Sequence, residues 1–212
     1  MPTPPLPPTK DRILDAAELL FADHGFDATS LRMITARASV NLAAVNYHFQ
    51  SKEALLDATI ARRATPINHR RLELLAAFEA EADGKPVAVE NLLDAFLRPI
   101  LEAGSMVPRL IVRMLYLEQK PVFKRIFERH LQPIVQRFSE AFVRSLPHVP
   151  PNEVMLRLLF VMGAFAQMMS SAGALHVITE GRFPALEPAR CAAYLIAFSA
   201  AGLKAPPLGS TL

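Results

Sequence analysis

The sequence predicts an all-α protein made of two helical domains. Apolar residues recur at the three- and four-residue spacing of amphipathic helices, and runs with the strict alternation of β-strands are absent. Eighteen prolines and only eight glycines suit helices broken by proline better than a sheet protein rich in tight turns. A hydrophobic content of 51% is enough to give a chain of 212 residues a substantial core.

We expect four segments along the chain. Residues 1–9, MPTPPLPPT, form a disordered tail that lacks the apolar stretch of a signal peptide. A first domain is predicted at 10–56 and a second at 57–204, and residues 205–212 form a loose tail. The single cysteine, Cys191, excludes an internal disulfide and indicates a reducing compartment, so we expect a cytoplasmic protein.

The first domain is predicted to contain three short helices. A helix over 10–24 carries an apolar stripe and ends at Gly25, a residue type favoured after helix C-termini. A second helix over 30–38 and a third over 42–49 follow, separated by a short turn. The third helix packs inward through Val45 and Phe49, spaced i, i+4, so its other face points outward.

This pair of short helices has the features of a helix-turn-helix. The third helix is thin enough for the major groove of DNA, and small residues at its N-terminal end let the backbone approach base edges closely. We predict that the outward face and its flanks contact DNA, with phosphate anchors at Ser30, Arg32 and Lys52 and groove contacts from Ala43, Ala44, Asn46, Tyr47 and His48. The alternative is a solvated helix face with ordinary surface charges.

Charge is distributed unevenly over the same segment. No Asp or Glu occurs between Asp27 and Glu53, whereas the preceding helix is acidic. A polyanion can orient on such a sided field, which favours the interpretation as a DNA-binding element. Lys10 and Arg12 leave open a second contact, in which the N-terminal tail acts as a minor-groove arm.

The stretch from about Lys10 to Leu56 resembles the DNA-binding domain of the TetR family of bacterial transcriptional regulators. The resemblance rests on a set of residues: Gly25-Phe26, Thr29-Ser30, Ile34, Val40, Tyr47-His48-Phe49 and Ser51-Lys52-Glu53. Ser39 stands where the family usually has Gly, at an expected cost of about 1 kcal/mol for a left-handed residue, and Thr35 stands where Ala is usual. The resemblance implies a homodimer that binds a palindromic double-stranded DNA operator, most often as a repressor.

The remaining helices follow in order. Ser51 is expected to cap a fourth helix that bends at Pro66 and ends near residue 82. Further helices are predicted over 87–103, 107–119, 122–146, 152–178 and 189–203, with the third of these continuous in spite of Pro133. This plan also resembles the family. Three segments, NLAAVNYHFQSKEALL, RLIVRMLYLE and LRLLFVMGAF, look most like a fatty-acid-responsive subgroup.

Residues 158–178 form a run of 21 residues without Asp, Glu, Lys or Arg. Its length fits a membrane span, but polar interruptions and flanking arginines at both ends favour a helix packed closely by other helices, so we expect no membrane contact. With the last helix it would form a four-helix bundle with a second copy. The predicted dimer interface is Gly163, Ala164, Gln167, Ser171, Tyr194 and Phe198.

The second domain is rich in Phe and Met, which suits an adaptable apolar pocket as well as an ordinary core. Arg113 and Arg157 lie inside apolar helical runs, where a cation needs a partner. That partner is either an internal acid (Glu102, Glu118 or Glu153) or the head group of an amphiphile. We predict an apolar effector with an acidic head, a fatty acid or acyl-coenzyme A, contacted by Arg113, Arg157, Met114, Phe127, Phe138 and Phe165.

Enzyme signatures are absent: the sequence has no HExxH, Walker A, GxSxG or CxxC motif, and its six histidines are dispersed. We therefore expect no enzyme, no cofactor and no metal. Two other functions stay open besides the ligand-responsive regulator. One is a DNA-binding dimer without a small-molecule effector, and the other is a helical lipid-binding protein that does not bind DNA.

Overall fold

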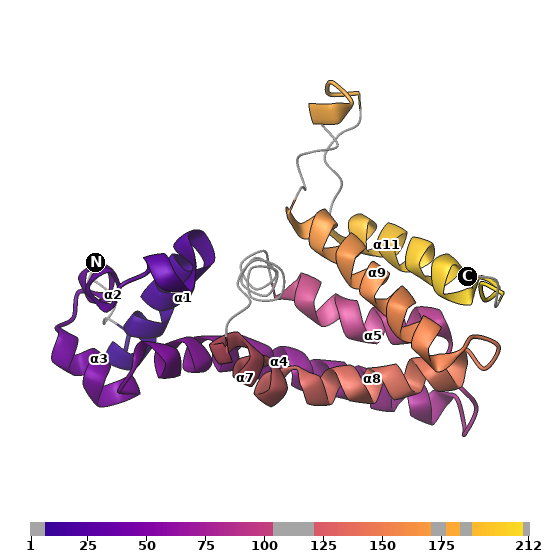
Figure 1. Ribbon diagram of the computed structural model, residues 1–212, viewed down its shortest axis with the longest axis horizontal. Coiled ribbons are helices and arrows are strands. Elements are labelled where there is room, and N and C mark those ends of the chain that lie inside the picture. The colour runs from indigo at the N-terminus through magenta and orange to yellow at the C-terminus, as the bar shows by residue number, and fades with distance from the viewer. Residues whose placement is uncertain (1–6, 104–120, 171–176, 183–187, 210–212) are drawn as a thin grey trace, which may run out of the picture. The chain divides into compact units, whose positions relative to one another are not determined.

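The computed structural model describes residues 7–103, 121–170, 177–182 and 188–209. Every regular element in these ranges is an α-helix, which confirms the predicted fold class (Figure 1). The described residues form two compact units, the first from residues 7–65 and 121–130 and the second from residues 66–103 and onward from 131. Helix α4 (Lys52–Glu81) contributes to both. The functional boundary after residue 56 stays a prediction.

The first unit is built on three helices: α1 (Thr9–Ala28), α2 (Leu31–Ala38) and α3 (Leu42–Phe49). All three pack against one another. Their core contains Ile13, Phe21, Ile34, Val45 and Phe49, all buried. Helix α3 has the predicted bounds, and its two inward residues are the predicted pair, so the rest of this helix faces away from the core.

Helix α1 is interrupted at Gly25, which has φ 85° and ψ 174°, a combination that L-residues rarely adopt. The buried hydroxyl of Thr29 lies 3.0 Å from the carbonyl oxygen of Leu20 and 2.7 Å from that of Gly25, and donates to them. This hydroxyl therefore ties the last regular turn of the helix to the residue at which the helix is interrupted. The predicted end of the helix at Gly25 is therefore the point where its regular turns stop, and one further turn follows.

Ion pairs join the other helices of the first unit to this core. Glu18 of α1 is buried and accepts hydrogen bonds of 2.8 Å from both Arg62 and Arg63 of α4. Burial alone would lower the pKa of Arg62, but hydrogen bonds to Glu18 and Asp15 outweigh that effect and raise the pKa. Helix α7 (Pro121–His130) is tied to α4 by Arg129, which donates to Asp57 at 2.8 Å.

The second unit combines the later part of α4 with α5 (Val89–Glu102), α8 (Gln132–Ser145), α9 (Pro151–Ser170) and α11 (Pro188–Lys204). Helix α5 packs on both α8 and α11, and α9 lies beside α11 (Figure 1). Its core contains Leu92, Leu93, Leu97, Phe138 and Phe142, all buried. The predicted helix over 107–119 lies outside the described residues.

The prediction of one continuous helix over 122–146 is wrong. The helix is interrupted at Leu131, which lies between α7 and α8, and Pro133 lies in the first turn of α8. The proline ring has no N–H and would collide with the carbonyl of residue 129 if the helix continued. In the first turn of a new helix, the same missing N–H costs nothing. Residues 171–176 of the predicted helix over 152–178 lie outside the described ranges.

The C-terminal segment was expected to be loose, but residues 205–208 are held in place. Arg157 of α9 donates to the carbonyl oxygens of Ala205 at 2.7 Å and Pro206 at 2.8 Å. The backbone N–H of Leu208 donates to the carboxylate of Glu153 at 3.2 Å. In the part of the chain that the structure describes, none of the helices has the length and apolarity to cross a membrane.

Candidate functional site

Capping residues lie at both ends of α2 and at the start of α3. The side chain of Ser30 accepts from the N–H of Met33 at 3.2 Å, and that of Asn41 accepts from the N–H of Ala44 at 2.9 Å, so each helix begins with a capped first turn. Between them, Ser39 has φ 52° and ψ 50°, a left-handed conformation. The Ser39 N–H closes the end of α2 on the carbonyl of Ala36. These contacts set how α3 leaves the core.

The outward face of α3 carries the predicted groove contacts. Ala43, Asn46, Tyr47 and His48 are exposed, and Ala44 is half-buried at the capped N-terminal turn. Tyr47 is 83% exposed, and its ring lies edge-on to that of His48 at 5.1 Å between centroids. Because Val45 and Phe49 fix the opposite face, a rigid helix presents an amide, two rings and two small residues to solvent. Such a set fits base edges and backbone phosphates.

The three predicted phosphate anchors differ in how they are held. Arg32 is exposed on α2, and the hydroxyl of Ser30 uses an oxygen lone pair for capping and keeps its proton. Lys52 is half-buried at the start of α4. Its Nζ lies 4.4 Å from the centre of the Phe26 ring and 3.4 Å from the Asp27 carbonyl oxygen, to which it donates. This contact positions the ammonium group beside the end of α1 and leaves it further protons for an anion.

The predicted effector residues do not form one cluster in the described chain. Arg113 and Met114 lie outside the described residues, and Phe127 is half-buried on α7 in the first unit. Phe138 and Phe165 are buried in the second unit. Arg157 pairs with an internal acid, which was the predicted alternative to an effector head group. It donates to Glu153 at 2.6 Å and to four carbonyl oxygens near the end of the chain. This network holds the pKa of Glu153 below its ordinary value.

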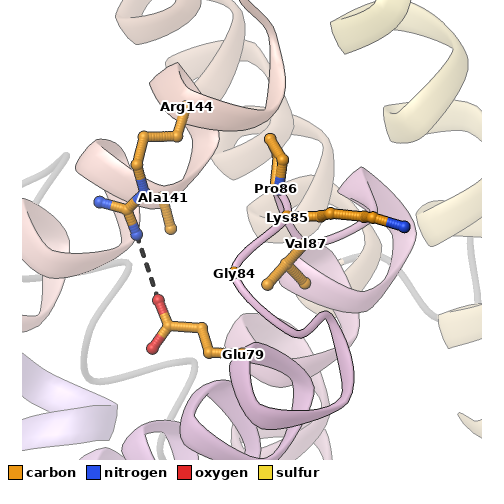
Figure 2. Close-up of a pocket in the computed structure, with 7 residues that line it drawn as sticks. All are labelled: Glu79, Gly84, Lys85, Pro86, Val87, Ala141 and Arg144. Carbon is orange, nitrogen blue, oxygen red and sulfur yellow. Dashed lines mark hydrogen bonds and ion pairs between the residues drawn. The ribbon is translucent and has the colours of Figure 1, made fainter.

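A pocket of about 190 Å³ lies where the turn after α4 meets α8. Figure 2 shows Glu79 and Arg144 joined across one side, at 3.1 Å, while Lys85 extends away from that pair. Arg137 also donates to Glu79. Because the lining combines a carboxylate with basic groups that already neutralise it, this pocket does not match the predicted apolar effector.

Sequence reasoning missed one residue of the second unit that stands out chemically. Arg71 of α4 is only 4% exposed. Its Nε donates to the carbonyl oxygen of Phe96 at 2.8 Å and its Nη1 to the side-chain oxygen of Asn68 at 3.1 Å, so both acceptors are neutral. Burial lowers the pKa of Arg71 to about 9. The only sequence signal was a buried-face position, four residues after Ile67 and four before Leu75.

One face of the second unit is apolar and uncovered. Helices α9 and α11 lie side by side, and their outward residues include Leu156, Leu159, Phe160, Tyr194 and Phe198, each about half exposed or more. Phe198 is 73% exposed. Of the predicted interface residues, Gly163 and Gln167 share this outward face, Ala164 is half-buried, and Ser171 lies outside the described residues. A patch of this kind marks an interaction surface.

A capped helix-turn-helix on a helical core, followed by a larger helical unit, defines the class of two-domain helix-turn-helix proteins. Family models agree with this class. Residues 13–59 match the model described as bacterial regulatory proteins of the tetR family, and residues 94–202 match the tetracyclin repressor-like C-terminal domain. The second match alone covers more than half of the chain, which therefore belongs to the TetR family of bacterial transcriptional regulators.

Individual proteins show the same division between a similar N-terminal segment and a divergent remainder. The chain is 40% identical over 53 residues to the probable HTH-type transcriptional regulator YttP of Bacillus subtilis. The aligned segment covers 25% of this chain and 26% of that regulator. The match thus spans about a quarter of the length of this relative. Mycobacterium smegmatis AmtR is 19% identical with a TM-score of 0.64, covering 97% of this chain and 90% of AmtR, and is similar in fold.

Proposed function

We propose that the protein is a homodimeric, sequence-specific DNA-binding regulator of the cytoplasm, acting as a repressor that an apolar effector releases from its operator. The outward face of α3 is the observation that carries the DNA-binding part. An exposed Asn46 is suited to bidentate contact with adenine, and the methyl groups of Ala43 and Ala44 are suited to contact with thymine. Ser30, Arg32 and Lys52 flank this face as phosphate contacts.

The DNA-binding part is tested with two substitutions that separate base readout from phosphate contact. Against a duplex selected from random DNA, Asn46→Ala should cost about 1–3 kcal/mol at one base position and relax the preference there. Lys52→Ala should weaken binding to all duplexes and reduce the salt slope by about one. Fluorescence anisotropy over a range of salt concentrations measures both effects. Unchanged operator affinity in the double variant would contradict the proposal.

The outward face of α9 and α11 supports the homodimer. A palindromic operator is read by two recognition helices about 34–36 Å apart, which requires two copies in a fixed arrangement. Two such pairs of helices can form a four-helix bundle that covers both apolar faces. A symmetric interface uses the same patch on both subunits, so a single self-complementary face is sufficient.

For the effector we propose an apolar molecule with an acidic head, such as a fatty acid or its coenzyme A thioester. The second unit has a largely apolar core, and an acyl chain gains roughly 0.8 kcal/mol for each buried CH₂. Chain length should therefore tune potency. Titrating the protein–operator complex with acids of increasing length tests this, and release that is independent of length, or no release at all, would contradict it. An effector changes DNA affinity only if it binds the two states unequally.

One observation favours an effector-independent DNA-binding dimer as the second candidate. Phe138 and Phe165, two of the predicted effector contacts, are fully packed within the described part of the second unit. Side chains that fill their own space leave no room for a ligand unless they move. The same titration decides between the candidates, since this alternative predicts that no acid releases the operator.

A further inference from the structure

Three partly buried arginines of the described residues have carboxylate partners. Arg62 pairs with Glu18 and Asp15, Arg137 with Glu79, and Arg157 with Glu153. Arg71 is more deeply buried than any of these three. Among the described residues, however, its acceptors are a backbone carbonyl and a side-chain amide. A buried cation without a counter-charge is costly to fold around.

The guanidinium of Arg71 is fixed in position although no carboxylate among the described residues pairs with it. Its central carbon lies 4.1 Å from the centre of the Phe96 ring. That ring in turn packs edge-on against buried Phe138 at 5.0 Å between centroids. Two described acceptors and an aromatic face hold the planar group in one orientation. Of its five N–H donors, the two described bonds use two, and the others remain for an acceptor of the right shape.

The surroundings of this cation are apolar. Ile67 and Leu75, one turn before and one turn after Arg71 on the same face of α4, are both buried. With Phe96 and Phe138 they place a cationic group beside an aliphatic and aromatic wall. An amphiphile with an anionic head and an apolar chain complements both parts, since the head neutralises the charge and the chain is removed from water.

We infer that Arg71 is the head-group anchor of the effector and binds its carboxylate. The inference rests on the proposed acidic, apolar effector and assigns it a contact that sequence reasoning had placed at Arg113 or Arg157. A guanidinium binds a carboxylate through two parallel N–H···O bonds, and such a pair is strongest where water is excluded. Because the described acceptors of Arg71 are neutral, its charge favours an acid over a neutral ligand.

The test compares an acid with its neutral analogue on the delipidated full-length protein. Isothermal titration measures binding of dodecanoate and of dodecan-1-ol to wild type, Arg71→Met, Arg71→Lys and the control Arg70→Met, whose exposed arginine pairs with Glu73. Wild type and control should prefer the acid by about 10- to 100-fold, as expected for a hydrogen bond to a charged group. Arg71→Met should bind both probes equally, and Arg71→Lys should keep only part of the preference.

The results for wild type and Arg71→Met distinguish the role of Arg71 from the proposed effector class. If wild type prefers the acid and Arg71→Met keeps that preference, the assignment to Arg71 is wrong while the effector class stands, and loss of the preference in Arg113→Met would place the head group there. If wild type shows no preference for the acid, the proposed effector class is wrong and the role of Arg71 with it.

Thermal unfolding of the ligand-free variants gives a second readout. Removing a buried charge that pairs with no acid in the described ranges should leave the unfolding temperature of Arg71→Met equal to or above that of wild type. A large fall in that temperature, together with weaker binding of dodecan-1-ol, would assign Arg71 a structural role and overturn the inference.

Discussion

The orientation of α3 within the first unit depends on a few backbone conformations and helix caps as well as on the buried side chains of Val45 and Phe49. Ser30 and Asn41 each satisfy a free N–H in the first turn of a helix, and a side chain at such a cap contributes about 1 kcal/mol. Ser39 opposes them, because its φ of 52° places a side chain where glycine is preferred. The turn therefore keeps its shape at a small cost in stability, which can be measured.

Replacing Ser39 by glycine should stabilise the protein. The left-handed conformation costs a residue with a Cβ about 1 kcal/mol, so Ser39→Gly should raise the unfolding temperature by roughly 2–4 °C in a chain of this size. Ser39→Ala is the matched control, because it removes the hydroxyl but keeps the Cβ, and should give no increase. Equal gains in the two variants would show that the hydroxyl, not the backbone conformation, was responsible.

Residues whose roles depend on neighbours in the sequence could be predicted, and those that depend on distant neighbours could not. Val45 and Phe49 are recognisable as the buried side of α3 from their spacing alone, and the left-handed turn at Ser39 was expected from the family pattern. Arg71 lies in a basic segment, HRRLEL, in which only its spacing from Ile67 and Leu75 indicates a buried face. Its contacts with the carbonyl and ring of Phe96 come from a residue 25 positions further along the chain.

At the scale of helices, interruptions were harder to predict than the helices themselves. The pattern over 122–146 predicts one continuous helix that contains Pro133, because a proline in a first turn and a proline in a helix interior look alike in sequence. The composition of the C-terminal segment is typical of tails and predicts a loose conformation. It is held instead by Arg157 and Glu153, which close the end of α11 with charged hydrogen bonds.

This C-terminal attachment should depend on pH. The hydrogen bond from Arg157 lowers the pKa of Glu153, and the N–H of Leu208 also favours the ionised form. A carboxylate whose pKa is depressed in the folded state contributes stability above its unfolded pKa, about 4.3, and loses it as the pH falls through the folded value. Acidification below about pH 4.3 should therefore release the segment.

Amide hydrogen exchange at Leu208 measures that release directly. Its protection factor should fall with pH in wild type, and in Glu153→Gln it should be low at every pH. Glu128→Gln is the control, since Glu128 of α7 forms an exposed pair with Lys124 at 3.7 Å and should leave Leu208 unchanged. A wild-type protection factor that is constant between pH 6 and pH 3 would contradict a role for the Glu153 carboxylate.

At the scale of the whole molecule, sequence similarity to known regulators is higher in the N-terminal helix-turn-helix segment than in the remainder of the chain. The N-terminal segment shares 40% identity with a curated regulator, while solved structures that match over nearly the whole chain are similar mainly in fold. A helix that enters a groove of fixed dimensions has few solutions, whereas a core that surrounds different effectors is constrained only by packing. The effector and the operator sequence are accordingly properties of this chain's own side chains.

The exposed apolar face of α9 and α11 predicts that two copies of the chain dimerise through these helices. An added Cβ at Gly163 meets nothing within 4 Å in the single subunit, so Gly163→Arg is compatible with the subunit fold. Placed between two copies, the same arginine would be a buried charge without a partner, and the dimer should dissociate or aggregate. Operator affinity should fall with it, because one recognition helix reads only half of a palindromic site.

Ala76→Arg is the control for Gly163→Arg, since it introduces the same side chain at an exposed position of α4. Analytical ultracentrifugation at micromolar concentration should give twice the chain mass for wild type and for this control, and a smaller or polydisperse species for Gly163→Arg. Circular dichroism of the variant should retain the helical content of wild type, which separates dissociation from unfolding. If the wild-type protein sediments as a soluble monomer, the predicted dimer is wrong, because the apolar face of α9 and α11 would then be stable in water without a partner.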